Sequence, residues 1–306
     1  MTVEAGPVRT TQLANGFCFG EGPRWFEGLL WFSDMLGEAV HTVTLGGAST
    51  TLPLPGHAPS GLGFRPDGAL LIVSTERRQV LVYDGDTVEL LADLSAVVPA
   101  PLGDMVIDAH GRAYVGSQAR FGGERSDGEC IGGERSDGEC IGGGVIVRID
   151  PDRTVHVVAD ALDFPNGMAI TPDGTTLVVA ESTGCRLTAF TIDSEGGLSG
   201  RRAFADGLDG PPDGIAIDAE GGVWTALTLA HEFQRIVEGG AVTDRVDVGE
   251  RTAIACALGG PEGRTLFLVT TTDAYPQRLI GTTLSRVEAL MVDVPAPGDH
   301  EHGHHH

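Results

Sequence analysis

Basic residues are scarce in this chain of 306 residues, in which 20 Lys and Arg face 43 Asp and Glu and the formal net charge is -23. This balance argues against nucleic acid as a partner, because phosphate binding needs clustered basic side chains. No apolar run approaches the ~18 residues that span a bilayer, and the N-terminus, MTVEAGPVRTTQLANG, lacks the basic and apolar regions of a signal peptide. We therefore expect a cytoplasmic protein that binds neither nucleic acid nor membrane.

Paired cysteines are also missing. The five cysteines are odd in number and form no CxxC pair, so the sequence predicts neither a disulfide framework nor a zinc ribbon. A GxSxG motif, typical of serine hydrolases, is absent as well. Histidines cluster in the tail 299–306, DHEHGHHH, which we interpret as disordered or as a purification tag.

One hairpin pattern recurs six times along the chain. A few apolar residues lead into a turn with glycine and then into a strongly apolar strand, at 21–34, 60–75, 103–117, 166–182, 213–227 and 255–271. The turn glycines are Gly28, Gly68, Gly111, Gly174, Gly221 and Gly263. Four of their five intervals are 40 to 47 residues, the length of a propeller blade. The pattern predicts an all-β fold: one six-bladed β-propeller domain over residues 1–298, with each copy forming the inner two strands of a blade.

Segments between the copies can complete the blades. QVLVYDG, GVIVRID, RLTAFTID and RVEALMVD are strand candidates that would give four strands per blade around a central channel. A β-sandwich is the alternative, but it does not explain six evenly spaced copies of one hairpin.

The longest interval contains a segment at 117–144 in which GGERSDGECI occurs twice, at 122–131 and 132–141. Because it is polar, rich in glycine and without alternation, we predict a long loop. It follows a second strand, so we expect it above the channel mouth together with 273–282, as lids or specificity walls.

The first residues of the six copies should form a ring, because the innermost strand of every blade starts at the same rim of the channel. This ring consists of Glu21, Ser60, Gly103, Asn166, Asp213 and Ala255. Two carboxylates ~4 Å apart repel by roughly 4 kcal/mol at an effective dielectric constant near 20. Protonation, wide separation or a cation would relieve this repulsion, and a hard divalent cation is the simplest of the three. Glu21, Asn166 and Asp213 supply the oxygen ligands that calcium and magnesium prefer. Each residue taken singly could instead end a strand through a local turn hydrogen bond.

Three motifs carry a resemblance to a known family. With FGEGPRW (19–25), FPNGMAITPDG (164–174) and PPDGIAIDAEGGVW (212–224), the chain resembles the SMP-30/gluconolactonase/LRE family from Glu21 to residue 269. The resemblance implies a six-bladed propeller with one catalytic divalent cation, calcium foremost and zinc, manganese or magnesium as alternatives. It implies a lactone or related ester as substrate, Glu21, Asn166 and Asp213 as metal ligands, and Asp213 as general base.

The third copy departs from the family pattern. In PAPLGDMVIDAHGRAYVG, Gly103 stands where the family usually has Asn, and Pro101 stands where it has a substrate-binding Arg. Asp104 is retained, but alternation along a strand predicts that its side chain points off the ring. Ser60, Gly103 and Asp104 are candidates for substrate binding. The missing Asn and Arg favour smaller or more apolar lactones over aldonolactones.

Three functional readings follow from these residues. The first is a metal-dependent lactonase, in which Glu21 and Asn166 hold the ion and Asp213 also moves a proton. The second is a phosphotriesterase-like hydrolase on the same scaffold. The third is a non-catalytic propeller that binds a metal or a partner. His57 and His231 can reach the rim and are assigned no role.

Overall fold

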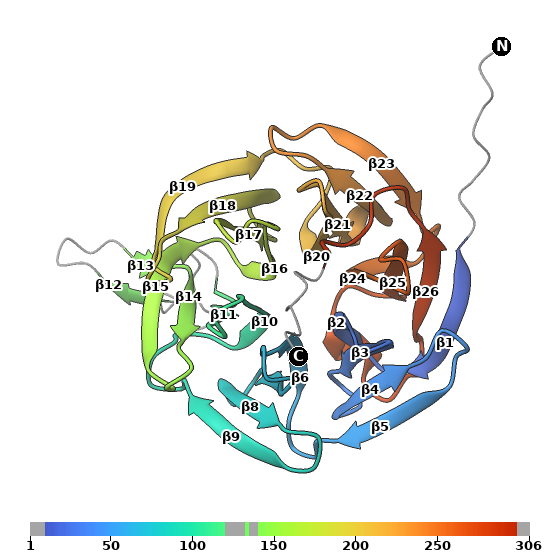
Figure 1. The fold of residues 1–306 in the computed structure, drawn as a ribbon, viewed down its shortest axis with the longest axis horizontal. Helices are drawn as coiled ribbons and strands as arrows, with labels where there is room; N and C mark the ends of the chain where they lie inside the picture. Colours follow the sequence, from blue (N-terminus) through green and yellow to red (C-terminus); the bar gives the residue numbers. More distant parts are fainter. Residues whose placement is uncertain (1–9, 120–131, 135–139, 299–306) are drawn as a thin grey trace, which may run out of the picture.

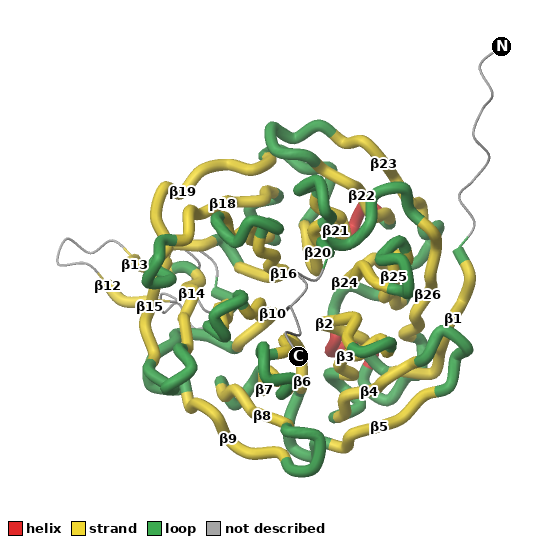
Figure 2. The backbone as a smooth tube through the Cα atoms, viewed as in Figure 1, coloured by secondary structure: helices red, strands yellow, loops and turns green. Residues whose placement is uncertain are grey.

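Six antiparallel sheets stand around a central channel in the computed structural model, which describes residues 10–119, 132–134 and 140–298 (Figures 1 and 2). Each sheet has four strands, so the fold is the predicted six-bladed β-propeller. Helix is confined, in the described residues, to the short 3-10 turns η1 (Thr228–Ala230) and η2 (Pro276–Leu279). No helix in this part of the chain is long and apolar enough to cross a membrane.

Each blade consists of four strands, which follow one another from the channel outward. Blade 1 contains β2 (Gly20–Phe26), β3 (Leu29–Asp34), β4 (Ala39–Val43) and β5 (Ser49–Pro53); blade 2 contains β6 (Pro59–Phe64), β7 (Leu70–Ser74), β8 (Gln79–Tyr83) and β9 (Val88–Asp93). Blade 3 contains β10 (Leu102–Ile107), β11 (Ala113–Ser117), β14 (Gly144–Ile149) and β15 (Val155–Leu162); blade 4 contains β16 (Pro165–Ile170), β17 (Thr176–Glu181), β18 (Arg186–Ile192) and β19 (Leu198–Ala205). Blade 5 contains β20 (Pro212–Ile217), β21 (Val223–Leu227), β22 (Glu232–Ile236) and β23 (Val242–Asp247); blade 6 contains β24 (Thr252–Gly259), β25 (Thr265–Thr271), β26 (Ser285–Met291) and β1 (Thr11–Phe17).

The six predicted hairpins are the inner two strands of the blades. All six turn glycines have φ between +67° and +87°, a conformation that glycine adopts without a Cβ clash. The strand candidates between the copies form β8, β14, β18 and β26, each the third strand of its blade.

Blade 6 is built from both ends of the described chain. Its outermost strand is β1, which pairs antiparallel with β26, with Phe17 opposite Ser285 and Thr11 opposite Ala289. Figure 1 shows β1 beside β26 on the outside of this blade. The pairing closes the ring, and the sequence reasoning did not foresee it.

Apolar side chains fill the contacts between blades. Six clusters of buried residues lie one at each blade-to-blade contact. Between blades 2 and 3, for example, Leu71 and Val73 of β7 pack with Leu102 and Met105 of β10. Strands apolar on both faces are expected in a sheet covered on both sides, and burial in these clusters is the main stabilising term of the fold.

The 117–144 segment contains a short hairpin where a loop without regular structure was expected. Gly132–Glu134 (β12) pairs antiparallel with Cys140–Gly142 (β13). Figure 1 places this hairpin at the outer edge of blade 3, beside β15 and away from the channel. The first copy of GGERSDGECI, at 122–131, lies outside the described residues, as does the tail 299–306.

Candidate functional site

Every innermost strand is bent near its start, at the rim where the ring was predicted. The strand register shifts between Glu21 and Arg24, Leu102 and Met105, Pro165 and Met168, and Pro212 and Ile215. The same shift occurs in β6 and β24. A bulge of this kind bends the strand and re-aims its side chains, here at equivalent positions around the channel.

Close approach between neighbouring inner strands identifies the equivalent residues. A Cβ built on Gly61 would lie 2.8 Å from the Cα of Asp104, and one built on Gly167 would lie 2.9 Å from the Cα of Gly214. Such contacts are too short for a real Cβ, so glycine is required at these positions. A Cβ on Gly214 would lie 2.6 Å from the Cα of Ala255. Ala255 is therefore equivalent to Asp104, and the ring prediction was one residue off in blade 6, where the ring residue is Ile254.

The two carboxylates of the ring are buried and act on each other. Glu21 and Asp213 are each 8% exposed. Burial, and then the charges of Asp213 and Asp104, raise the pKa of Glu21 well above its usual value. Burial, followed by the charge of Asp104, raises the pKa of Asp213 to about 8, against a smaller lowering by a hydrogen bond from Asn166. Without a positive charge beside them, both acids are therefore favoured in their protonated form.

Asn166 stands beside Asp213 in a fixed orientation. Its Nδ2 donates a hydrogen bond to Ser182 Oγ (3.4 Å), and Ser182 Oγ donates to the carbonyl oxygen of Pro212 (2.6 Å). This chain ties the amide of blade 4 to the start of β20 in blade 5. With its nitrogen engaged by Ser182, the Oδ1 of Asn166 remains available as a metal ligand.

The donor set at the ring fits a hard cation. Asp213 Oδ1 is buried and has no hydrogen-bond partner among the described residues, which is costly for a carboxylate unless an ion or proton sits there. Glu21, Asn166 and Asp213 offer only oxygens, as calcium and magnesium require. In the part of the chain that the structure describes, no three His, Cys, Asp or Glu side chains group together as a metal site. A cation at the ring thus needs the amide of Asn166 beside the two carboxylates.

Asp104 and Arg24 form an ion pair that crosses between blades. Arg24 Nη2 donates to Asp104 Oδ1 (3.0 Å) and to the carbonyl oxygen of Met105 (2.7 Å). The backbone N–H of Met168 in blade 4 also donates to Asp104 Oδ2 (3.4 Å). The carboxylate of Asp104 is thus held by blades 1 and 4, and its charge still raises the pKa of both ring acids.

Arg24 was not among the predicted site residues, although two features of the sequence indicate it. Arg24 is the one basic residue in the six innermost strands. Asp104 is the one charged residue at a position where the other blades have Gly22, Gly61, Gly167, Gly214 or Ala255. A single cation in the inner strands, and an anion at a position that is glycine or alanine in every other blade, predict a buried pair.

The other rim candidates have local partners. Ser60 is buried, and its carbonyl oxygen accepts a hydrogen bond from Ser33 Oγ (2.7 Å). His57 Nδ1 hydrogen-bonds Ser74 Oγ (2.8 Å), and the exposed His231 contacts the carbonyl oxygen of Arg251 (2.7 Å). In the predicted lid 273–282, Leu279 is buried in the core between blades 6 and 1.

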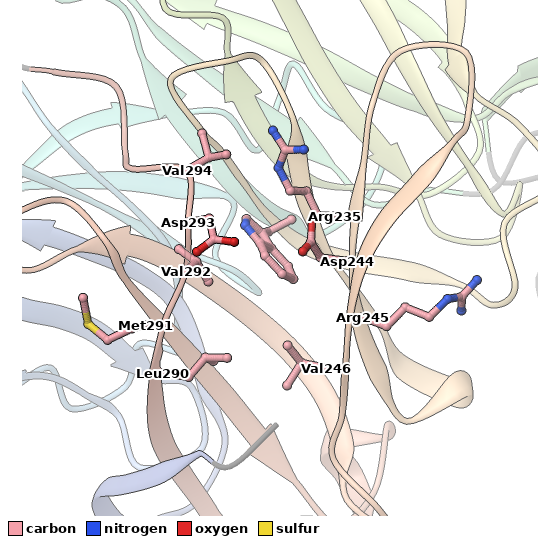
Figure 3. A pocket seen from close by; sticks show the side chains of 10 residues that line it. Arg235, Asp244, Arg245, Val246, Leu290, Met291, Val292, Asp293 and Val294 are labelled. Carbon is pink, nitrogen blue, oxygen red and sulfur yellow. The ribbon is translucent and has the colours of Figure 1, made fainter. Parts of the chain in front are cut away.

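A separate cavity of about 280 Å³ lies between blades 5 and 6 (Figure 3). Val246, Leu290 and Val292 form part of its wall, together with Arg235 and Arg245. Both cations are already paired, Arg235 with Asp218 (2.6 Å) and Arg245 with Glu232 (2.6 Å). None of the ring residues lines this cavity, so it is not part of the candidate site.

Known proteins are similar to this chain in sequence and in fold. Pentonolactonase XacC of Haloferax volcanii is 26% identical over 86% of this chain and 85% of its own length. The 6-deoxy-6-sulfogluconolactonase of Pseudomonas putida is 26% identical over 90% of this chain and 92% of its own length. A luciferin-regenerating enzyme has the same fold, with a TM-score of 0.75, 18% identity and coverage of 94% of this chain and 97% of that one. Residues 19–272 match the SMP-30/Gluconolactonase/LRE-like region, so the chain belongs to this family.

Proposed function

We propose that this protein is a divalent-metal-dependent lactonase whose cation is held by Glu21, Asn166 and Asp213. The observation that carries the proposal is the buried, unpartnered Asp213 Oδ1 in a ring with a second buried carboxylate and an oriented amide. Two relatives that match over most of their length are named lactonases, which supports a lactone as the substrate. The all-oxygen donor set favours calcium over zinc.

The residues of the ring divide the chemistry among them. When bound, the cation supplies Lewis-acid polarisation of the ester carbonyl and compensates the negative charge of the ring. Asp213 Oδ1 accepts the proton of the water that attacks the carbonyl carbon, because it is a buried carboxylate oxygen without a hydrogen-bond partner among the described residues. Glu21 and Asn166 keep their orientations through the Gly22 N–H and Ser182 respectively.

Purified protein tests this proposal directly. We expect about one divalent ion per chain, hydrolysis of γ- or δ-lactones that stops after treatment with a chelator, and recovery on addition of calcium. Hydrolysis of an aryl phosphotriester without lactone turnover would favour the phosphotriesterase reading. A bound metal without either activity would favour the non-catalytic propeller.

A further inference from the structure

Blade 3 contributes no side chain of its own to the ring. Its ring residue is Gly103. The residue before it, Leu102, pairs with Ser117, and the residue after it, Asp104, is held by Arg24. Neighbouring blades present Ser60 and Asn166 at this level. A glycine here would leave an open place in the channel wall, yet Gly103 is itself buried.

The side chain of Gln118 fills this place. A Cβ built on Gly103 would lie 2.4 Å from Gln118 Nε2, 2.6 Å from its Cδ and 2.9 Å from its Cγ. The end of the Gln118 side chain therefore occupies the volume that a side chain at residue 103 would take. Gln118 directly follows β11, whose last residue, Ser117, pairs with the first residue of β10.

The backbone around Gln118 is held on both sides. The N–H of Gln118 donates to the carbonyl oxygen of Pro101 (2.8 Å), and Ser117 Oγ donates to that of Ala100 (2.8 Å). The next residue, Ala119, is 2% exposed and accepts a hydrogen bond from the N–H of Phe164 (2.8 Å). Gln118 itself is half-buried, so a well-anchored backbone presents an amide that a ligand can still reach.

We infer that Gln118 is a substrate-binding residue that takes the place of a ring side chain in blade 3. The inference rests on the proposed function and adds to it a preference among lactones. An amide both donates and accepts hydrogen bonds, as a hydroxyl group does. The ligand group recognised by Gln118 is therefore a hydroxyl substituent on the lactone ring, beside the ester that reacts at Asp213.

Paired substrates test this assignment. We compare α-hydroxy-γ-butyrolactone with unsubstituted γ-butyrolactone, and use the corresponding lactams as non-hydrolysable ligands whose Kd is measured by calorimetry. Gln118→Met keeps the length of the side chain but loses both hydrogen-bonding groups. It should raise KM and the lactam Kd for the hydroxylated ring by about 2- to 12-fold, the factor for one neutral hydrogen bond. The values for the unsubstituted ring should stay within about twofold.

A double-mutant cycle separates this role from a structural one. Gly103→Ala places a methyl group where the Gln118 amide lies, so it should reproduce the loss seen in Gln118→Ala. Added to Gln118→Ala, it should cost nothing further, because the displaced group is already gone. The unfolding midpoint of each variant controls for folding.

Two results would overturn the inference, and they differ. If the parent protein binds and hydrolyses lactones but Gln118→Met treats both rings as the parent does, Gln118 has no part in recognition and the proposed function stands. If the parent neither binds nor hydrolyses any lactone, the proposed function falls and this inference falls with it.

Discussion

Asp213 is a buried acid at the channel mouth whose ionised form is strongly disfavoured by its surroundings. It is buried next to Glu21 and Asp104, both acidic, and burial is the larger cause of its raised pKa. A carboxylate that must be ionised in such a place needs a cation beside it. Its unpartnered Oδ1 is also the oxygen that can take up a proton.

Replacement of Asp213 by Asn should abolish turnover. Asn keeps the shape of the side chain but can neither carry the charge nor accept the proton, so we expect kcat/KM to fall by about 100-fold or more. The fold should survive, because the apolar contacts between blades stabilise the propeller without help from the ring. Circular dichroism and steady-state kinetics on the same preparation measure both effects.

Asp173→Asn is the matched control for this variant. Asp173 is exposed in the turn between β16 and β17, where it accepts hydrogen bonds from nearby Thr171 and Thr175. It should keep parental activity. Parental activity in Asp213→Asn would refute the assignment of the site.

The sequence predicted the ring residues better than it predicted their surroundings. Glu21, Asn166 and Asp213 could be found by counting back from the turn glycines, because the hairpins have nearly constant length. The same counting gave Ala255 instead of Ile254, since the turn glycine follows the ring residue by nine residues in blade 6 and by eight in blades 2 to 5. The position of Gln118 over Gly103 could not be predicted, because it depends on how the chain leaves β11.

Strand β17 ends in a buried acid, Glu181, whose hydrogen bonds link several segments of blade 4. Glu181 is fully buried and accepts hydrogen bonds from Arg186 Nη2 (2.6 Å), Arg201 Nη2 (3.2 Å) and the Asp163 N–H (2.7 Å). These contacts join β17 to β18, to β19 and to the segment before β16. Burial alone would raise the pKa of Glu181, but the hydrogen bonds, led by that from Arg186, outweigh it and lower the pKa.

Glu181→Gln should destabilise the protein in a way that depends on pH. At pH 7 we expect the free energy of unfolding to fall by about 1.5–3 kcal/mol, the range for hydrogen bonds to a charged group. Because the pKa of Glu181 is lower in the folded than in the unfolded chain, its contribution is complete above the unfolded value near 4.3. The contribution is lost as the pH falls through the folded value, so the two proteins should converge in acid.

Urea unfolding at pH 7 and near pH 3.5 measures this difference. Glu238→Gln is the control, because Glu238 pairs with Arg202 at an exposed site (2.9 Å), where an ion pair contributes about 0–1 kcal/mol. An equal effect of the two substitutions at pH 7 would contradict the role given to Glu181.

Strand β1 should contribute to stability chiefly through its last residue. Phe17 packs edge-on against Phe32 of blade 1 (4.8 Å between ring centroids) while its backbone pairs with Ser285. Phe17→Ala should lower the free energy of unfolding by about 3–5 kcal/mol, the usual cost for a buried Phe. Gln12→Ala, at an exposed position of the same strand, should change it by less than about 0.5 kcal/mol. Similar losses in both variants would contradict the role given to the Phe17 side chain.

The elements themselves were largely predictable, and the closing strand was not. Gly28, Gly111 and Gly221 indicate hairpin turns because they have a positive φ. The apolar strands that follow them can be predicted from their own residues. Strand β1 has the sequence TQLANGF, whose residues are mostly exposed or half-buried, so no local pattern of apolar residues predicts a strand here. Its identity as a strand comes from β26, at the other end of the chain.

At the scale of the whole molecule, the net charge of -23 opposes compactness. Added salt shortens the Debye length from about 30 Å at 0.01 M to about 8 Å at 0.15 M and screens this repulsion. We therefore expect the thermal unfolding midpoint to rise by about 2 °C or more between 10 and 150 mM KCl. Scanning calorimetry measures it.

Choline chloride at the same ionic strength should raise the midpoint equally. Screening does not depend on which monovalent cation is added. A rise with KCl but not with choline chloride would indicate bound potassium, and a fall in both would show that favourable ion pairs, not repulsion, dominate the surface.

The pairing of β1 with β26 also sets an order of events during synthesis. Strand β1 is made before every other described strand and β26 after all of them, with roughly 270 residues between the two. At about 5–20 residues per second, a ribosome takes roughly 15 to 50 seconds to cover that interval. Blades 1 to 5 can each assemble from consecutive strands as they emerge, whereas β1 must wait for its partner. The propeller therefore closes as a late step of its own biosynthesis, and until then an unpaired strand leads the growing chain.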